Sequence, residues 1–169
     1  ALPISAIVNE VMNPLIGVLP KSCVVIDMSS SDPMQTRALA KRLSDVGIQM
    51  IDAPVSGGVK KAVDGSLAIM VGGDNDTFAK VRPVLESLGK SITHVGPIGS
   101  GHALKSLNNY VSAAALIATA EAIHAGVAFG IDAKTVVDVI NASTGKNNTT
   151  ENKAHQFMLS GAFNSGFSL

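Results

Sequence analysis

The sequence has almost no cysteine, no excess of either charge and no long apolar run. Its one cysteine, Cys23, excludes an internal disulfide and fits a reducing compartment. The formal net charge is 0, whereas a nucleic-acid-binding domain needs a basic face. The longest apolar run, residues 111–120, is too short to span a bilayer. We therefore expect a cytoplasmic protein whose partners include neither nucleic acid nor a membrane.

Metal-ligand spacing and a complete dinucleotide fingerprint are also missing. The four histidines do not follow the spacing of a metal site, so we predict no metal. The fingerprint G-x-G-x-x-G is not found either. Gly99 and Gly101 have its first spacing, but Leu104 occupies the position of the third glycine.

Residues 1 to about 97 alternate between strand and helix patterns. Asp32 and Pro33 indicate a helix start, with an N-cap followed by proline at the first helical position. Pro14 interrupts another helical pattern, over residues 5–19. Apolar strands are predicted at residues 24–26, 48–53, 67–71 and 92–95. Such alternation favours an α/β layer with a mainly parallel sheet.

The pattern changes after residues 99–101, and no strand signal follows Val95. Residues 102–129 form one alanine-rich helical pattern, and Asp132 can cap a further helix. A last helix is predicted around residues 151–159. We therefore expect two domains, an α/β domain at residues 1–98 and an all-helical one, entered through a long helix, at residues 99–169.

Two motifs indicate chemistry on a small anion. D-A-P-V-S-G-G, residues 52–58, predicts a strand end that breaks into a turn at Pro54. Its hydroxyl and bare amides could hold a carboxylate, since glycine lets a ligand approach the main chain; these groups belong to Ser56, Gly57 and Gly58. Lys105 and Asn109 are four residues apart and share one face of the long helix.

Together these motifs resemble the β-hydroxyacid dehydrogenase family. The matching segments are D-A-P-V-S-G-G, G-S-L-A-I-M-V-G-G at residues 65–73 and G-S-G-H-A-L-K-S-L-N-N at residues 99–109. The resemblance implies the second half of a Rossmann-type domain, followed by an all-α domain. It also implies NAD or NADP as cofactor, a small carboxylic acid as substrate, and a homodimer or homotetramer.

The resemblance assigns roles to individual residues. It makes Lys105 the catalytic acid/base, and as a base this lysine needs a pKa below its ordinary value, which burial could achieve. Substrate binding is assigned to Ser56, Gly57, Gly58 and Asn109. Cofactor contacts are assigned to Leu2, Pro3 and Ser30, the last standing where the family usually has threonine. We treat His102, three residues before Lys105, only as a modulator.

Several interpretations stay open at this point. The preferred one is an enzyme that interconverts a β-hydroxyacid and its semialdehyde, nearest to 3-hydroxyisobutyrate dehydrogenase. A tartronate semialdehyde reductase is a close alternative, and a decarboxylating sugar-acid dehydrogenase is less favoured. A non-catalytic binding or assembly module is the alternative from another class. Because the fingerprint is missing, we expect a piece of a longer protein that alone neither binds cofactor tightly nor turns over.

Overall fold

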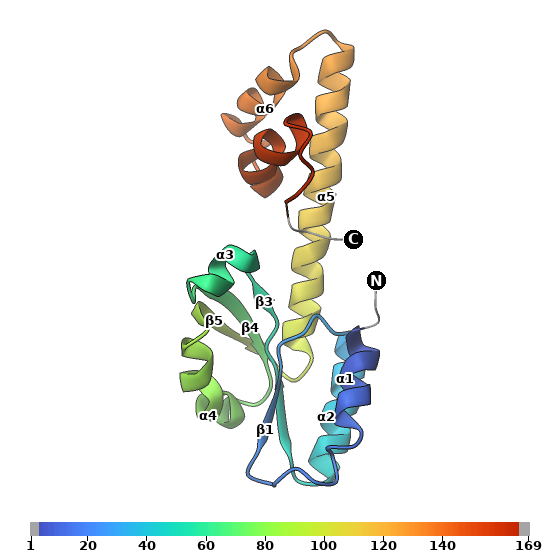
Figure 1. The fold of residues 1–169 in the computed structure, drawn as a ribbon, viewed down its shortest axis with the longest axis vertical. Coiled ribbons are helices and arrows are strands. Elements are labelled where there is room, and N and C mark those ends of the chain that lie inside the picture. Colours follow the sequence, from blue (N-terminus) through green and yellow to red (C-terminus); the bar gives the residue numbers. More distant parts are fainter. Residues whose placement is uncertain (1–3, 166–169) are drawn as a thin grey trace. The chain divides into compact units, whose positions relative to one another are not determined.

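The computed structural model describes residues 4–165, so the cofactor residues expected at Leu2 and Pro3 lie outside the described part. The chain divides into two compact units, residues 1–107 and 108–169, and each is described by itself. The dividing point falls inside one long helix, α5 (Ser100–Ala128). Figure 1 shows the elements of both units.

The first unit contains a five-stranded sheet with helices between its strands. The strands are β1 (Val24–Asp27), β2 (Gln49–Asp52), β3 (Val55–Ser56), β4 (Leu67–Gly72) and β5 (Gly89–Gly96). The helices before α5 are α1 (Ile4–Met12), α2 (Pro33–Asp45), α3 (Gly58–Val63) and α4 (Asn75–Glu86). The predicted alternation is confirmed, with β3 and α3 as additions in a stretch that we expected to be a turn.

The sheet is mixed, whereas the sequence predicted a mainly parallel one. Strand β1 pairs in parallel with β2, and β4 pairs in parallel with β5. Strand β4 is antiparallel to both β2 and β3. Only the short α3 separates β3 from β4, and a parallel crossover needs a dozen or more connecting residues. The chain therefore turns back on itself at this point.

Helices cover both faces of the sheet in this unit (Figure 1). On one face, α1 and α2 bury a cluster that includes Leu39, Leu43 and Met50. On the other face, α4 buries a second cluster that includes Ile51, Val71 and Leu85. Consecutive residues of β2 point to opposite faces, so Met50 and Ile51 enter different clusters. This central strand is buried on both sides and ends at Asp52, the first residue of the motif at residues 52–58.

Local signals set the starts of two helices where the sequence predicted them, whereas the first helix is shorter than predicted. The Asp32 carboxylate accepts a hydrogen bond from Met34 N at 2.7 Å, with Pro33 at the first helical position of α2. Asp132 likewise caps α6 (Ala133–Asn141), where it accepts from Thr135 N at 3.0 Å. The helix predicted at residues 5–19 ends at Met12, two residues before Pro14.

In the second unit, the described residues form only helices. The unit begins with the later turns of α5, continues with α6 and then with η1 (Thr150–Leu159). The helix η1 is wound as a π-helix. The core of the unit contains Ile123, Val137 and Ala154, one from each of these three helices. The predicted helix at residues 151–159 is confirmed, but nothing in the sequence pattern indicated its π-type winding.

Helix α5 is long and apolar enough to cross a membrane, judged by length and composition alone. Our expectation from the sequence considered only residues 111–120, whereas the helix extends this apolar stretch on both sides. One such helix is weak evidence for a membrane span, because core helices of other proteins pass the same test.

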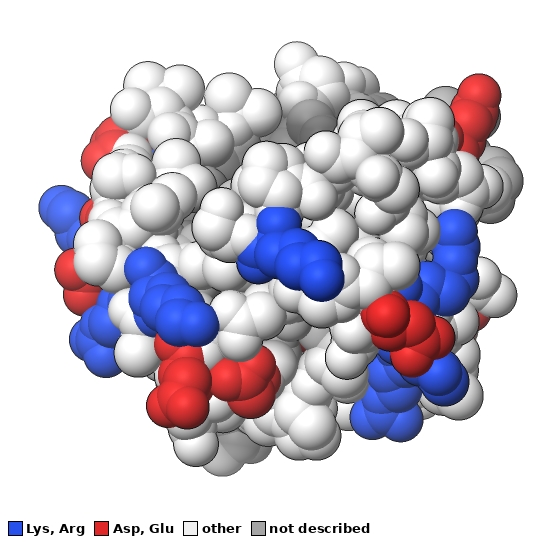
Figure 2. All heavy atoms as spheres, turned by 90° about the horizontal axis from the view of Figure 1, so that it is seen from below, with Lys and Arg blue, Asp and Glu red and all other residues white. Residues whose placement is uncertain are grey.

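Charged side chains of both signs lie close together on the face shown in Figure 2. Helix α2 carries the ion pair Lys41–Asp45 at 3.0 Å, and α4 carries Arg82–Glu86 at 2.8 Å. Both pairs are spaced four residues apart and exposed, so each contributes little stability. The mixture of signs agrees with the balanced composition of the sequence.

Candidate active site

The motif at residues 52–58 starts at a strand end and finishes in a tight turn. Asp52 is the last residue of β2, and Ser56 pairs with Ala68 of β4. Gly57 has φ +138°, a backbone conformation that favours glycine, and a Cβ here would meet the Lys61 side chain. Ser56 is half-buried, while Gly57 and Gly58 are exposed, so their backbone is open to solvent.

Lys105 lies on the second turn of α5 and is half-buried. Burial lowers the pKa of this lysine below its ordinary value, because desolvation disfavours the ammonium form. Within residues 4–165, no hydrogen bond or ion pair engages its ammonium group. The side chain thus meets two requirements for proton transfer, a lowered pKa and an uncommitted nitrogen.

Asn109 is one helical turn beyond Lys105 on α5 and is also half-buried. It lines a pocket of about 250 Å³ within the second unit. The polar wall of this pocket adds Ser112 of α5 and Lys153 of η1, and its apolar wall includes Leu116 and Phe157. No sequence pattern associates Lys153 with Asn109, since the two residues are far apart along the chain.

Ser30 is exposed in the loop that follows β1, next to a hydrogen bond of 2.8 Å between the hydroxyls of Ser29 and Ser31. Strands β1 and β2 run in parallel and end in register, with Asp27 opposite Asp52. The loops after these strands therefore leave from the same edge of the sheet. In open α/β sheets, dinucleotides bind outside this carboxyl edge.

Asp52 anchors the start of α5, a role that the sequence analysis missed. Its carboxylate is 0% exposed and accepts from Gly99 N and His102 N, both at 2.7 Å. The helix approaches so closely that a Cβ on Gly101 would lie 2.8 Å from Asp52 Oδ2 and would also clash with Met70 O. A buried carboxylate at a helix start satisfies orphan amides and interacts favourably with the helix dipole.

His102 is the second residue whose environment the sequence did not indicate. Its ring is 0% exposed and contacts Thr36 Oγ1 of α2 at 2.8 Å and the Ser29 carbonyl oxygen at 3.1 Å. The histidine thus links α2, the loop after β1 and the first turn of α5. The only feature of the sequence that singled out His102 is its position three residues before Lys105. That position says nothing of the contacts with Thr36 and Ser29.

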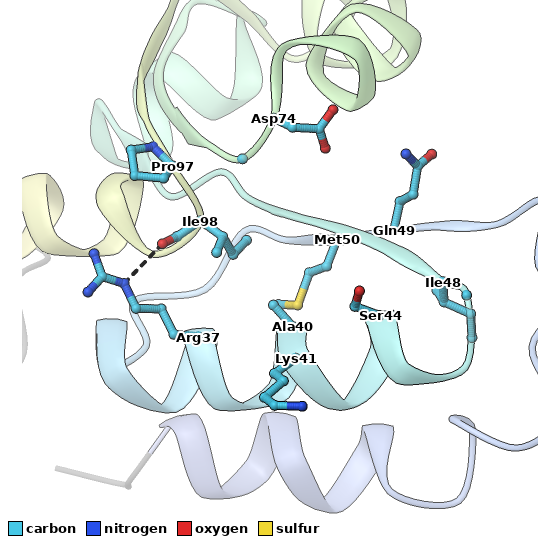
Figure 3. Close-up of a pocket in the computed structure, with 12 residues that line it drawn as sticks. Arg37, Ala40, Lys41, Ser44, Ile48, Gln49, Met50, Asp74, Pro97 and Ile98 are labelled. Atoms are coloured by element: carbon cyan, nitrogen blue, oxygen red, sulfur yellow. Dashed lines mark hydrogen bonds between the residues drawn. The ribbon is translucent and has the colours of Figure 1, made fainter.

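A pocket of about 640 Å³ in the first unit lies elsewhere (Figure 3). It opens between α2, the start of β2 and the segments after β4 and β5, and its walls include Arg37, Ala40, Met50 and Pro97. Arg37 Nε donates to the Ile98 carbonyl oxygen at 3.1 Å on its rim. None of the predicted site residues lines it.

Comparison with known proteins identifies the class. Residues 1–96 match the family model for the NAD-binding domain of 6-phosphogluconate dehydrogenase. Residues 99–169 match the NAD-binding domain model of NADP-dependent 3-hydroxyisobutyrate dehydrogenase. The two matches together cover nearly all of the chain, and both models describe NAD-binding domains of dehydrogenases.

Individual relatives identify the family. The 2-(hydroxymethyl)glutarate dehydrogenase of Eubacterium barkeri is 42% identical across all of this chain, which spans 57% of that enzyme. The mitochondrial 3-hydroxyisobutyrate dehydrogenase of Mus musculus is 38% identical over 86% of the chain, corresponding to 44% of that enzyme. The chain belongs to the β-hydroxyacid dehydrogenase family.

A solved structure agrees with this assignment. The 3-hydroxyisobutyrate dehydrogenase of Mycobacterium tuberculosis, solved with L-serine, superimposes with a TM-score of 0.83 at 35% identity. The match covers 88% of this chain and 51% of that one. The chain therefore spans about half the length of the relatives that it matches.

Proposed function

We propose that the full-length protein containing this chain is an NAD(P)-dependent dehydrogenase that interconverts a small β-hydroxyacid and its semialdehyde. The observation that carries this proposal is Lys105, which is half-buried, has a lowered pKa and carries an uncommitted ammonium group. It stands in the segment G-S-G-H-A-L-K, on a helix whose start is fixed by Asp52. A surface lysine without a catalytic role needs none of these features.

In this proposal the residues of the chain bind the acid and move one proton. The nicotinamide, when bound, supplies or accepts the hydride. In the reduction, Lys105 Nζ donates a proton to the carbonyl oxygen; in the oxidation, its neutral amine accepts the hydroxyl proton. Ser56 Oγ and the amides of Gly57 and Gly58 hold the carboxylate, and the Asn109 amide bonds the substrate.

The cofactor contact that we propose lies at the carboxyl edge of the sheet. Ser30 is exposed there, just beyond the parallel strand ends at Asp27 and Asp52. A loop at this edge fits the nicotinamide end of NAD or NADP. Leu2 and Pro3 remain candidates for the same end, on the resemblance alone.

Domain and assembly assignments are part of the proposal. We propose a partial Rossmann-like domain at residues 1–98, and an inter-domain helix with the start of a helical domain at residues 99–169. The limits of the two family models, 1–96 and 99–169, support this division. We further propose a cytoplasmic homodimer or homotetramer, in which protein and not lipid covers α5.

Removal of the lysine side chain tests the proposed chemistry. In the full-length protein, Lys105→Ala should reduce kcat/KM by at least about 10²-fold, the usual contribution of a positioned acid/base. The matched control is Lys134→Ala, which removes an exposed lysine paired with Asp138 at 2.8 Å. If Lys105→Ala folds normally and keeps its turnover, the assignment of Lys105 as acid/base is wrong. If the unsubstituted full-length protein shows no NAD(P)-dependent turnover, a non-catalytic module is favoured.

A second substrate class is favoured by one specific observation. The pocket that Asn109 lines also has Lys153 and Ser112 in its wall, so a cation and a hydroxyl lie near this candidate substrate-binding residue within the second unit. The Eubacterium barkeri relative is named for a substrate with two carboxylates. We therefore propose hydroxyacids with a second carboxylate as the alternative to 3-hydroxyisobutyrate and tartronate semialdehyde.

A further inference from the structure

The side chain of Lys61 folds back against the glycine turn of the motif at residues 52–58. A Cβ placed on Gly57 would lie 2.6 Å from both Cβ and Cδ of Lys61, and 3.0 Å from its Cγ. The apolar stem of the lysine therefore runs along the main chain of Gly57. Glycine at this position leaves the stem the space to do so, in addition to accepting φ +138°.

The short helix α3 explains why this lysine returns to the turn. Gly57 is the N-cap of α3, and Lys61 follows it four positions later, which is about one helical turn. Side chains at this spacing share a face of the helix, and each leans toward the helix N-terminus. The side chain of Lys61 therefore lies over Gly57, whereas that of its neighbour Lys60 leaves the helix on another side.

The charge of Lys61 has no carboxylate of its own. Within residues 4–165, no hydrogen bond or ion pair engages its ammonium group. Lys60 has an acid nearby, because the pKa of Asp64 is lowered chiefly by the hydrogen bond from the Ser66 hydroxyl and further by the charges of Lys90 and Lys60. The cation beside the turn is thus free to attract an anionic ligand.

We propose that Lys61 is a specificity-determining residue, which selects for the negative charge of the substrate carboxylate held at Ser56, Gly57 and Gly58. The hydroxyl and the amides of the turn are neutral donors, so they direct the carboxylate without compensating its charge. The ammonium of Lys61 supplies that charge. Because Lys61 is exposed, its attraction acts partly through solvent and is modest. The inference rests on the proposed function, which takes this turn as the carboxylate site.

Substitution of Lys61 in the full-length enzyme should change KM and leave kcat almost unchanged. At low ionic strength, Lys61→Met should raise KM for 3-hydroxyisobutyrate about three- to fivefold, the upper range for an exposed ion pair. Lys61→Arg keeps the charge and should restore KM. The matched control is Lys60→Met, which removes a charge from the same helix on another side and should raise KM less. Equal KM values for the two Met variants contradict the proposal.

Salt separates the charge of Lys61 from the packing of its stem. The screening length in water falls from about 10 Å at 0.1 M salt to about 3 Å at 1 M. The difference in KM between the unsubstituted enzyme and Lys61→Met should therefore shrink as salt is added. A difference that stays the same at the higher salt concentration comes from the turn or the stem, and it would overturn the electrostatic role.

The same role can be measured without turnover. Isobutyrate has the carboxylate of 3-hydroxyisobutyrate but no hydroxyl to oxidise, so it serves as an unreactive probe of the carboxylate site. We expect calorimetric titration of isobutyrate into the full-length protein, with NAD or NADP present, to give a dissociation constant about three- to fivefold higher for Lys61→Met than for Lys60→Met. Melting temperatures of both variants should equal that of the unsubstituted protein, since both lysines are exposed.

The outcomes separate the role of Lys61 from the proposed function. Equal dissociation constants for Lys61→Met and Lys60→Met overturn the role of Lys61 and leave the dehydrogenase assignment intact. If Lys105→Ala keeps full turnover, the acid/base assignment fails, while the difference between the two Met variants still reports on Lys61. An unsubstituted protein that neither binds isobutyrate nor oxidises a small hydroxyacid contradicts both proposals.

Discussion

At the scale of single residues, Lys105 has the environment most closely tied to catalysis. Burial lowers its pKa below the ordinary value of 10.5, so at a given pH below that value more of the amine is neutral. Oxidation uses the neutral amine, so its kcat/KM should rise with pH and level off below pH 10.5. Reduction uses the ammonium, so its kcat/KM should fall over the same interval. The measurement is kcat/KM as a function of pH, for the oxidation and for the reduction.

Lys105→Arg is the matched variant for this profile. A guanidinium stays protonated throughout the accessible pH range, so it can polarise a carbonyl but cannot act as the base. Oxidation should fall by at least about 10²-fold, and reduction should fall less and lose its dependence on this group. A wild-type oxidation profile that still rises through the ordinary lysine value would contradict the role of burial.

Lys153 allows a test of the second substrate class. In a pocket of about 250 Å³ with Asn109, its ammonium could pair with a second carboxylate. Lys153→Met keeps much of the apolar stem and removes the charge, so KM should rise about tenfold for a dicarboxylic hydroxyacid and stay within about twofold for 3-hydroxyisobutyrate. The control is Lys146→Met, which removes an exposed lysine paired with Glu151 at 2.7 Å. Equal KM changes for both acids would exclude this role.

At the scale of elements, the close contact between the start of α5 and the end of β2 depends on glycine. A Cβ at Gly101 would clash with Met70 O and lie 2.8 Å from Asp52 Oδ2. Gly101→Ala should therefore cost about 1–3 kcal/mol of unfolding free energy, as overpacking typically does. Gly17→Ala is the control, since a Cβ there meets nothing within 4 Å. Urea unfolding of both variants checks this, and equal midpoints would contradict it.

The elements that could be predicted correctly are those whose sequence signals lie in residues close together along the chain. The start of α2 required only Asp32 and Pro33, and the alternation of strands and helices required only apolar periodicity. The antiparallel direction of β4 and the two-residue strand β3 depend on a pairing between segments and have no local signal. The same holds for the π-type winding of η1.

The candidate site shows the same difference between local and long-range signals. Its half-buried candidates Lys105 and Ser56 stand in motifs that can be recognised in the sequence. The supporting contacts join residues about 50 or more positions apart, as in Asp52 with His102 and Ser29 with His102. Hydrophobic patterns do not report buried polar partners at such separations, and a lone histidine on a helix has many ordinary explanations.

At the scale of the whole molecule, the chain spans 57% of its Eubacterium barkeri relative and 44% of its mouse relative. Much of an enzyme of this family therefore consists of residues other than those described. In our proposal the residues of the chain supply the proton donor and the groups that bind the substrate carboxylate. The complete cofactor site is a property of the full-length protein. Kinetic tests consequently use that protein.

Assembly is the remaining property of the whole molecule that the structure lets us test. In the second unit, α5 exposes apolar side chains over several turns, including Val111 (64%) and Ile117 (59%). Exposed apolar surface of this kind marks a contact with another protein surface, and we propose a second copy of the chain. The full-length protein should sediment as a dimer or tetramer. Val111→Glu combined with Ile117→Glu should give monomers with unchanged helix content, because a buried carboxylate opposes the interface.

The matched control for this test is Val139→Glu, on α6 of the same unit. Val139 is 58% exposed, close to Ile117, so the change adds the same charge at similar exposure without touching α5. Its sedimentation should equal that of the unsubstituted protein. A double variant on α5 that keeps its assembly would place the interface elsewhere. A double variant that loses its circular dichroism would instead show that α5 is covered by other parts of the same chain.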